Sequence, residues 1–204
     1  MPDFEFSAGD LCLDFANTWG NREDEVDDRL SCYGDLVEWA LQAGIVDDAG
    51  CRRLQRLANR HPAEAGEAYD AAVSLREVVF RVCSAAATHR SPDASDLEIL
   101  NRWYSAVPRR RLCGGGECCE WEWPEDEDNL HRAMWPVLRS ACDLLTSADV
   151  KRIRECGAPD CSWLFIDSSR GGRRKWCDMS VCGNRAKARR YYARHRGTIE
   201  QGRA

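Results

Sequence analysis

Two pairs of cysteines near the C-terminal end constrain the fold of this 204-residue chain more than any other feature. Both pairs have the spacing C-x4-C, and the four residues are Cys156, Cys161, Cys177 and Cys182. Thiolates are preferred ligands of a closed tetrahedral zinc site, and two short loops that each supply two ligands are inexpensive to order. We therefore predict one structural Zn²⁺ ion, bound by these four side chains.

The segment between the two pairs predicts a small fold built around the metal. Residues 163–166 (WLFI) are β-prone, residues 167–172 have the composition of a turn, and residues 173–176 return as a second strand. We expect a helix to follow and its first turn to carry Cys182. Because a unit of about 40 residues seldom buries enough apolar surface to fold alone, the metal replaces a core. Residues 150–204 are thus predicted to form a zinc-bound hairpin and helix.

A disulfide framework is the alternative for the same four cysteines. Disulfides are typical of exported proteins, whereas this sequence opens with MPDFEFSAGDL, which has neither the basic region nor the apolar region of a signal peptide. The sequence also has no uncharged apolar stretch of about 18 residues, the length that a membrane-spanning helix needs. We expect a cytoplasmic protein with reduced cysteines and no membrane association.

Charge divides the chain at nearly the same place. Residues 150–204 contain 14 Lys and Arg against 5 Asp and Glu, whereas residues 1–149 contain 15 against 29. A segment this basic is typical of nucleic-acid binding, because cationic side chains displace counterions from phosphate. In the alternative, the acidic half attracts the basic half and partly masks it, which would itself regulate binding.

A helix that begins near Cys182 places its basic side chains in two stripes on roughly opposite sides. The first stripe consists of Lys187, Arg190 and Arg194, and the second consists of Arg185, Arg189 and Arg196. Each stripe could follow one phosphate backbone of double-stranded DNA, while Asn184 or an arginine reaches base edges. With the basic residues of the hairpin added, the predicted DNA contacts are Arg170, Arg173, Arg174, Lys175, Asn184, Arg185, Lys187, Arg189, Arg190 and Arg194. For any single arginine, the alternative is a solvated surface position.

Several motifs resemble a known family. Residues 156–170 (CGAPDCSWLFIDSSR) and 173–189 (RRKWCDMSVCGNRAKAR) closely resemble the CGNR zinc-finger family, and residues 9–18 (GDLCLDFANT) resemble the opening of the ABATE domain that accompanies it. The segments LRE at 75–77 and SACDLLTS at 140–147 agree with that domain. The resemblance spans nearly the whole chain. It implies a bacterial stress-induced transcription regulator with a mainly helical N-terminal domain and a DNA-binding zinc finger.

One position departs from the family pattern. Lys175 stands where the resemblance leads us to expect arginine before the Trp-Cys pair. A lysine can still contact phosphate, but it lacks the bidentate geometry of a guanidinium.

Residues 1–149 predict a mainly α-helical domain with a small β-hairpin, long enough for a single core. We expect helices over residues 35–43, from Asp47 or Asp48 to 60, over 62–88, after Pro92, and over 130–146. The 62–88 helix has an apolar stripe, with Arg76 and Arg81 predicted to lie away from it. The helix after Pro92 is predicted to turn Leu97, Leu100, Trp103 and Tyr104 inward. Residues 109–123 (RRRLCGGGECCEWEW) alternate around a glycine-rich turn and predict the hairpin.

A polar group stands out in the apolar N-terminal segment. Asp14, Asn17 and Thr18 could bind a small effector molecule, with Trp19, Trp39 and Trp103 lining an apolar pocket. The same three polar residues could instead cap a helix or fix a turn, and the tryptophans could be ordinary core residues.

Eight cysteines lie outside the two pairs. Five of them are scattered among apolar positions and resemble small buried hydrophobic residues: Cys12, Cys32, Cys51, Cys83 and Cys142. The other three, Cys113, Cys118 and Cys119, cluster in the predicted hairpin, where they could bind a second metal with His131 or sense oxidants. A second zinc would need a fourth ligand in reach, and nearby glutamates oppose the low thiol pKa that oxidant sensing requires.

The motifs favour a regulator over an enzyme. The sequence contains no phosphate-binding glycine loop, no H-E-x-x-H and no G-x-S-x-G, and four thiolates leave zinc no open position for water. We predict a DNA-binding transcription regulator whose domain at 1–149 senses a signal or mediates assembly, and a homodimer would increase its specificity. The alternatives are a zinc-stabilised protein-interaction module, for example with the transcription machinery, or, less favoured, a small-molecule enzyme or a redox sensor.

Overall fold

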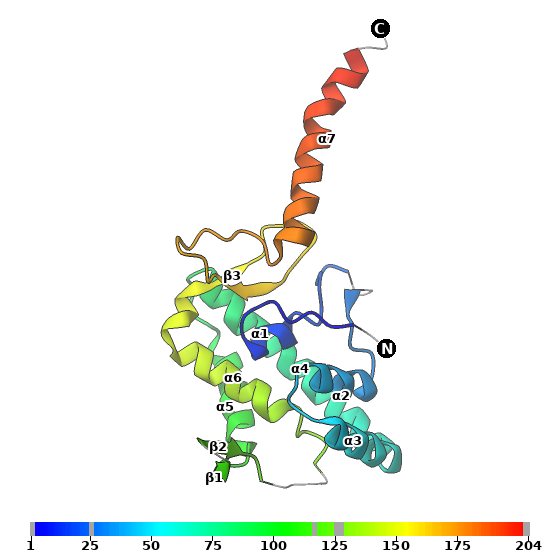
Figure 1. The fold of residues 1–204 in the computed structure, drawn as a ribbon, viewed down its shortest axis with the longest axis vertical. Helices are drawn as coiled ribbons and strands as arrows, with labels where there is room; N and C mark the ends of the chain where they lie inside the picture. The colour runs from blue at the N-terminus through cyan, green and yellow to red at the C-terminus, as the bar shows by residue number, and fades with distance from the viewer. Residues whose placement is uncertain (1–2, 25–26, 116–117, 125–128, 202–204) are drawn as a thin grey trace.

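The computed structural model describes residues 3–24, 27–115, 118–124 and 129–201. Helices dominate the first part of the chain, and two short strand pairs accompany them (Figure 1). The N-terminal helices are α1 (Leu11–Ala16), α2 (Tyr33–Gln42), α3 (Asp48–Arg60), α4 (Pro62–Ala87), α5 (Ala94–Ala106) and α6 (Met134–Thr146). We call residues 3–149 the body and residues 150–201 the finger.

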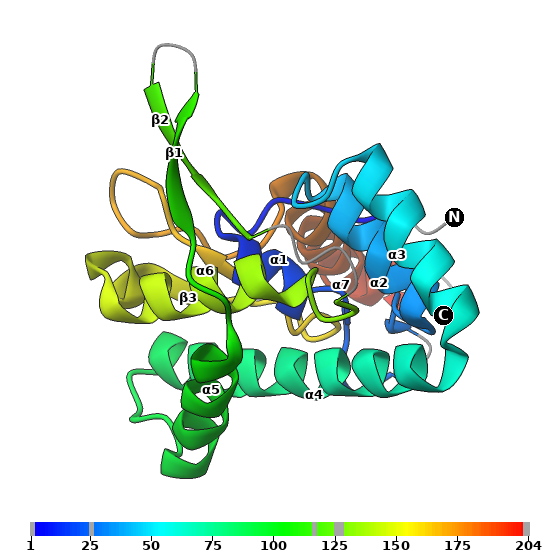
Figure 2. The same cartoon turned by 90° about the horizontal axis from the view of Figure 1, so that it is seen from below.

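Helix α4 is the central element of the body. It contacts α1, α2, α3, α5 and α6, and Figure 2 shows it running along the full length of the body. At 26 residues it is long enough to pack against every other body helix. The predicted mainly helical N-terminal domain is confirmed.

Local signals explain where α3 and α4 begin. The Asp47 carboxylate accepts a hydrogen bond from the Gly50 backbone N–H at 2.7 Å, so it caps the first turn of α3. Pro62 occupies the first turn of α4, where its missing N–H costs nothing. Gly44, with φ +70°, follows α2 in the left-handed conformation that ends many helices. Helices α3 and α4 therefore begin where the sequence predicts.

The body has one apolar core, which extends from Phe4 to Leu164. Trp39 is fully buried and packs on Phe15, with 4.9 Å between ring centroids. Cys12, Cys51 and Cys83 are buried as predicted, whereas Cys32 is exposed and Cys142 is half-buried. On α5, Leu100 is buried and Trp103 is half-buried against the core, as predicted. Leu97 and Tyr104 are 38% and 40% exposed, so the prediction that these two face inward is wrong. Helix α5 crosses one end of the body and buries a single narrow edge.

Arg76 is a further correction in the body. The sequence places it away from the apolar stripe of α4, but its side chain is fully buried. Its two terminal nitrogens, Nη1 and Nη2, each donate to the Asp28 carboxylate at 2.7 Å, and its Nε donates to Glu77 at 2.9 Å. A buried guanidinium is tolerated because this pairing satisfies it. The pair joins α4 to the segment that follows α1.

Two antiparallel strand pairs complete the fold. Strand β1 (Arg111–Gly115) pairs with β2 (Cys118–Glu122), which confirms the hairpin predicted in the body. In the finger, β3 (Ile153–Glu155) pairs with β4 (Leu164–Ile166), so the prediction that residues 173–176 form the partner strand is wrong. Ile153 and Leu164 belong to the apolar core of the body, and this burial selects β3 as the partner of β4.

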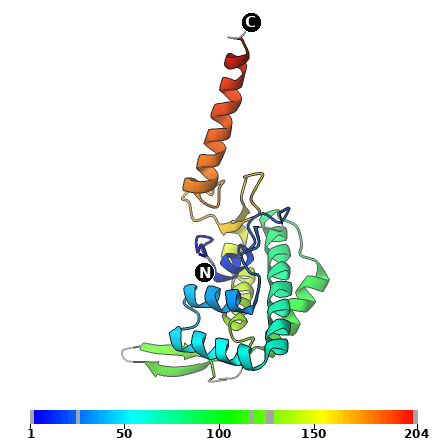
Figure 3. The same ribbon diagram turned by 90° about the vertical axis from the view of Figure 1, so that its right-hand side faces the viewer.

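Helix α7 (Asn184–Gln201) follows the finger strands and projects away from the body, as Figures 1 and 3 both show. A π-helical turn, Met179–Gly183, leads into it. Within the described part of the chain, no helix has the combination of length and apolar character needed to cross a bilayer.

Candidate metal centre and basic helix

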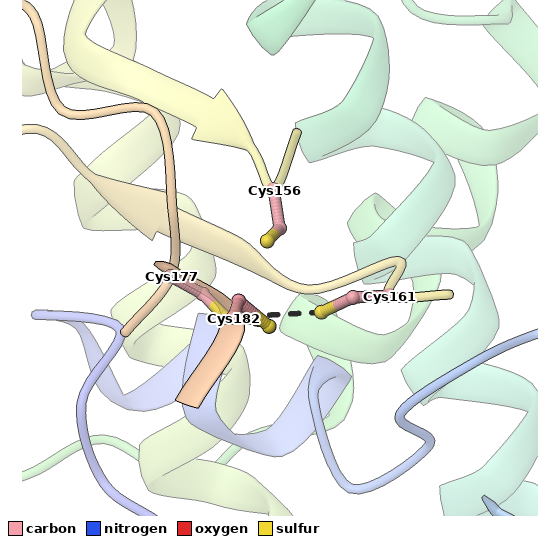
Figure 4. Close-up of side chains that lie close together, drawn as sticks. All are labelled: Cys156, Cys161, Cys177 and Cys182. Carbon is pink, nitrogen blue, oxygen red and sulfur yellow. Dashed lines mark hydrogen bonds between the residues drawn. The ribbon is translucent and has the colours of Figure 1, made fainter. Parts of the chain in front are cut away.

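The four predicted zinc ligands come together in the finger, although they come from four different backbone settings. Cys156 directly follows β3, Cys161 shortly precedes β4, Cys177 lies in the loop after β4, and Cys182 lies in the π-helical turn. Their sulfur atoms all lie within 4.8 Å of one another (Figure 4). The Sγ atom of Cys177 is 3.7 Å from that of Cys161 and 3.6 Å from that of Cys182.

This sulfur arrangement fits zinc. A tetrahedral ion with Zn–S bonds of about 2.3 Å requires sulfur–sulfur separations of about 3.8 Å. The observed separations are close to that value and far above the length of a disulfide bond, which is about 2.0 Å, and all four cysteines are free. Cys156, Cys177 and Cys182 are buried and Cys161 is half-buried. The site is therefore a closed four-thiolate centre for one structural zinc ion.

Contacts among the thiols show how the site is prepared for a cation. Hydrogen bonds from Cys161 and Cys177 lower the pKa of Cys156 to about 2. The hydrogen bond with Cys156 in turn raises the pKa of Cys161 to about 12, and it raises the pKa of Cys177 as well. These thiols therefore compete for protons within one cluster. Zinc binding displaces these protons, because each sulfur ligates as a thiolate.

Groups around the ligands fix their positions. Arg185 Nη2 lies 3.0 Å from the Cys182 sulfur. Arg174 donates through Nε to the Trp176 carbonyl at 3.0 Å and through Nη2 to the Cys177 carbonyl, and its guanidinium carbon lies 4.5 Å from the centre of the Phe165 ring. Such outer contacts orient metal ligands and tune their charge. The guanidinium of Arg174 therefore forms its hydrogen bonds within the finger.

Gly183 lies close to two side chains of the π-helical turn and the loop before it. A Cβ atom at this position would overlap the sulfur of Met179, whose side chain is exposed and can move, and would lie 3.2 Å from the Trp176 ring.

Asp160 is a site residue that the sequence analysis missed. Its carboxylate, in the loop between Cys156 and Cys161, lies 3.2 Å from Arg185 Nη1 and 3.2 Å from Arg189 Nη1. The first zinc-binding loop thus holds the first two turns of α7. The sequence does contain a signal for this role. Each C-x4-C loop has one acidic residue, and in the first loop this residue is Asp160.

The remaining predicted DNA contacts lie on the finger surface. Arg170, Arg173 and Lys175 are exposed on the loop after β4, and Lys187, Arg190 and Arg194 are exposed on α7. The Asn184 side chain donates to the Ser180 carbonyl at 2.9 Å, so its amide is turned toward the π-helical turn. The side chain of Arg196 lies outside the described residues.

Asn17, predicted as a ligand contact, joins the body to the finger. Its Oδ1 accepts from the Leu164 backbone N–H, and its Nδ2 donates to the Leu164 carbonyl, both at 2.8 Å. Ser162 adds two further links, donating from its backbone N–H to the Gly20 carbonyl at 2.9 Å and accepting at its Oγ from the Arg22 backbone N–H at 3.2 Å. These contacts favour the structural alternative for Asn17.

Asp14 and Thr18 also make structural contacts. Asp14 Oδ1 accepts from the Ala8 backbone N–H at 2.9 Å, and burial raises the pKa of this carboxyl to about 6. The Thr18 hydroxyl donates to the Phe15 carbonyl at 2.8 Å and lies 3.2 Å from Arg76 Nη1. Trp39 is fully buried within the core, whereas Trp103 is half-buried against that core beside His131, so the two do not line one pocket.

Among the described residues, the four finger cysteines are the one group of possible metal ligands whose ligand atoms lie close together. The hairpin cysteines in this part of the chain therefore form no second metal centre. A hydrogen bond with Glu122 raises the pKa of Cys113, which opposes thiolate formation.

Comparison with known proteins agrees with this architecture. The family model described as "ABATE: Putative stress-induced transcription regulator" matches residues 9–148, and the CGNR zinc-finger model matches residues 152–195. No curated protein matches the sequence. Because the first match alone covers more than half of the chain, the chain belongs to the ABATE family, and its C-terminal module is a CGNR zinc finger.

Proposed function

We propose that the protein is a DNA-binding transcription regulator in which the zinc finger holds α7 as the main DNA contact. The carrying observation is the surface of that helix, which projects from the body (Figure 3). Lys187, Arg190 and Arg194 are exposed there and form no ion pair within the described residues. We call these three residues the open stripe. A double helix offers the phosphate groups that such a stripe would bind.

The dimensions of α7 support this proposal. An α-helix fits the major groove of B-form DNA, which is about 12 Å wide. The 18 residues of α7 span roughly 27 Å at 1.5 Å per residue, which is long enough to lie along several base pairs. Arg170, Arg173 and Lys175, exposed on the loop after β4, extend the proposed contact beyond the helix. Arg174 is not part of it, because its guanidinium is bonded within the finger.

Arg185 and Arg189 have a different role in this proposal. Both are paired with Asp160, so their charge is partly balanced before any DNA binds. They hold the base of α7 against the first zinc-binding loop, and the open stripe provides the phosphate contacts. The zinc is structural, since four protein thiolates leave no position for a reacting water molecule, and the proposal therefore assigns no catalytic activity.

The body completes the regulator. Its attachment to the finger through Asn17 and Ser162 would allow a signal received by the body to reach the DNA contact. We propose that this domain senses a stress signal or mediates assembly, including a homodimer, and that the protein acts in the bacterial cytoplasm, where DNA is present and thiols stay reduced.

The test measures binding of a fluorescent random-sequence duplex of 20 base pairs across a salt series. We compare the native chain with the double variant Lys187→Ala/Arg190→Ala, and with Arg52→Ala/Arg56→Ala as a matched control on the exposed face of α3. Removal of two phosphate contacts should weaken binding at least tenfold and reduce the slope of log K against log salt by about 2. The control should bind like the native chain.

Zinc gives a second arm of the same experiment. Protein stripped by a chelator should lose duplex binding, and re-addition of Zn²⁺ should restore it. Equal binding by both double variants would place the interface elsewhere and overturn the role of the open stripe.

A protein partner is the second candidate, because α7 also exposes apolar surface. Tyr191 and Tyr192 are 59% and 69% exposed, and Val181 and Met179 are exposed in the turn before the helix. Aromatic residues of this kind are enriched at protein interfaces. Zinc-loaded protein that fails to bind the duplex even at low salt would overturn the DNA proposal and favour this candidate.

A further inference from the structure

A cleft in the body, beside the β1–β2 hairpin and so at the opposite end of the molecule from α7 (Figure 1), has no part in the proposed DNA contact. It has a volume of about 590 Å³ and lies where the end of α5, the base of the β1–β2 hairpin and α6 meet. Figure 2 shows this hairpin standing out from the body. Pockets of about 300–1,000 Å³ are typical of small-molecule sites. The cleft therefore has the right size for a ligand.

The charge of the cleft is opposite to that of the body around it. Residues 1–149 carry 29 acidic against 15 basic side chains, yet the described residues that line the cleft include Arg109, Arg110 and Arg139 and no acidic side chain. Arg109 and Arg110 have no ion-pair partner in the described residues. The guanidinium groups of Arg109 and Arg110 attract an anion, and each can bind a carboxylate or phosphate with two parallel hydrogen bonds. Arg139 adds a third guanidinium group, whose charge is partly balanced by Asp143.

The third of these arginines is held in a fixed position. Arg139 Nε donates to Asp143 at 2.8 Å and its Nη1 donates to the Tyr104 hydroxyl at 3.0 Å. Each partner occupies one nitrogen of the guanidinium group, and the Arg139 side chain still lines the cleft. A fixed guanidinium loses less entropy when an anion binds.

Aromatic side chains form the other wall. Trp121 and Trp123 line the cleft on the hairpin side, and Trp121 is 58% exposed. The guanidinium of Arg110 lies 5.5 Å from the ring centre of each tryptophan. The exposed indole ring of Trp121, beside the guanidinium groups of Arg109 and Arg110, provides a stacking surface next to an anion site.

We propose that this cleft binds a planar aromatic anion. The carboxylate or phosphate of the ligand would contact Arg109, Arg110 and Arg139, and its ring would stack on Trp121. This inference does not depend on DNA binding, because the finger contributes none of the lining residues. An aromatic carboxylate and a nucleotide share this chemistry, and the choice of probes separates them.

The test is isothermal titration calorimetry on the full zinc-loaded chain with two matched pairs of probes. Benzoate is compared with its neutral counterpart benzamide, and AMP with adenosine. We expect at least one anion to bind with a Kd below about 1 mM, and its neutral counterpart to bind at least about tenfold more weakly. Binding of benzoate alone identifies a carboxylate site, and binding of AMP alone identifies a phosphate site. Equal affinity within both pairs overturns the proposal.

Two variants locate the binding. Arg110→Ala and Trp121→Ala should each weaken the anion by about tenfold or more, whereas Arg102→Ala, an exposed arginine of α5 outside the cleft lining, should not. Perturbation of the Trp121 indole N–H resonance on titration gives a readout that does not require a variant. If neither anion binds, or if Arg102→Ala weakens binding as much as Arg110→Ala, the cleft is not the site. Binding of an acidic peptide without either small anion would likewise reject it in favour of a macromolecular partner.

Discussion

The body and the finger are stabilised in opposite ways. The body has a continuous apolar core, in which α4 packs against five other helices. The finger has a separate small cluster, in which Cys156, Cys177 and Cys182 are themselves half of the buried members, beside Ala158, Trp163 and Phe165. The first region excludes water with hydrocarbon, and the second depends on a metal to join its loops. The comparison shows that the same chain uses two different sources of stability a few residues apart.

The largest expected effect is removal of the metal. Cys177→Ser should release zinc and unfold the metal-dependent part of the finger, residues 156 to 195, because structural zinc contributes about 10–16 kcal/mol of binding free energy to such modules. Most of the helical circular dichroism should remain, because the body has its own core. Zinc content per chain and hydrogen exchange of both regions check this. Cys119→Ser, an exposed cysteine of the hairpin, is the control. One zinc ion retained in Cys177→Ser would show that this residue is not a ligand.

The second largest effect is expected in the body, from the loss of a buried ion pair. Arg76→Ala should lower the free energy of unfolding by about 3–5 kcal/mol, because it leaves Asp28 without its buried partner. The control on the same helix is Glu67→Ala, at an exposed position of α4, so the loss should be below about 1 kcal/mol. Urea unfolding measures both. Equal losses of unfolding free energy in the two variants would show that the buried Arg76–Asp28 pair does not stabilise the body.

The stability of the body and the zinc affinity of the finger should change with pH in opposite directions. Burial raises the pKa of Asp14 to about 6, from a usual value of 3.8. Its contribution to stability is therefore fully present below about pH 4 and is lost as pH rises through about 6, a change of about 3 kcal/mol. Zinc binding in the finger has the opposite dependence and strengthens with rising pH, since its ligands must lose protons.

Asp14→Asn should flatten this part of the pH profile of the body. The measurement is urea unfolding followed by tryptophan fluorescence between pH 4 and pH 7, with Asp70→Asn, an exposed carboxylate of α4, as the control. An Asp14→Asn profile with the native slope would refute the assignment to this carboxyl.

The smallest effect concerns the junction of the two regions. Asn17→Ala removes both hydrogen bonds to Leu164 and leaves a buried N–H and carbonyl without partners, which should cost about 1–3 kcal/mol. Hydrogen exchange in β4 and zinc release to a chelator should both become faster, while Asn59→Ala, exposed on α3, changes neither. Unchanged exchange in β4 would show that the body does not support the finger through this residue.

Features encoded locally could be predicted from the sequence. Asp47 and Pro62 mark the starts of α3 and α4, because each signal lies at the first turn of its helix. The zinc ligands were predictable because the two members of each cysteine pair lie five positions apart and the two pairs have the same spacing. The β1–β2 hairpin was likewise predictable from the local sequence.

Features that depend on distant partners could not be predicted. The burial of Arg76 requires Asp28, which lies 48 residues away, and the structural role of Asn17 requires Leu164, which lies 147 residues away. The choice of β3 over residues 173–176 as the partner of β4 likewise depends on where the core of the body lies, which no local pattern reports.

The attachment of α7 has a mechanical consequence. Asp160 holds the base of the helix through two ion pairs, and beyond Arg189 the helix extends freely for most of its length. It is therefore a lever about 27 Å long. A rotation of the finger by about 10° would move the tip by about 5 Å, more than the rise of about 3.4 Å per base pair. A small rotation of the finger is therefore amplified into a displacement of several ångströms at the far end of α7.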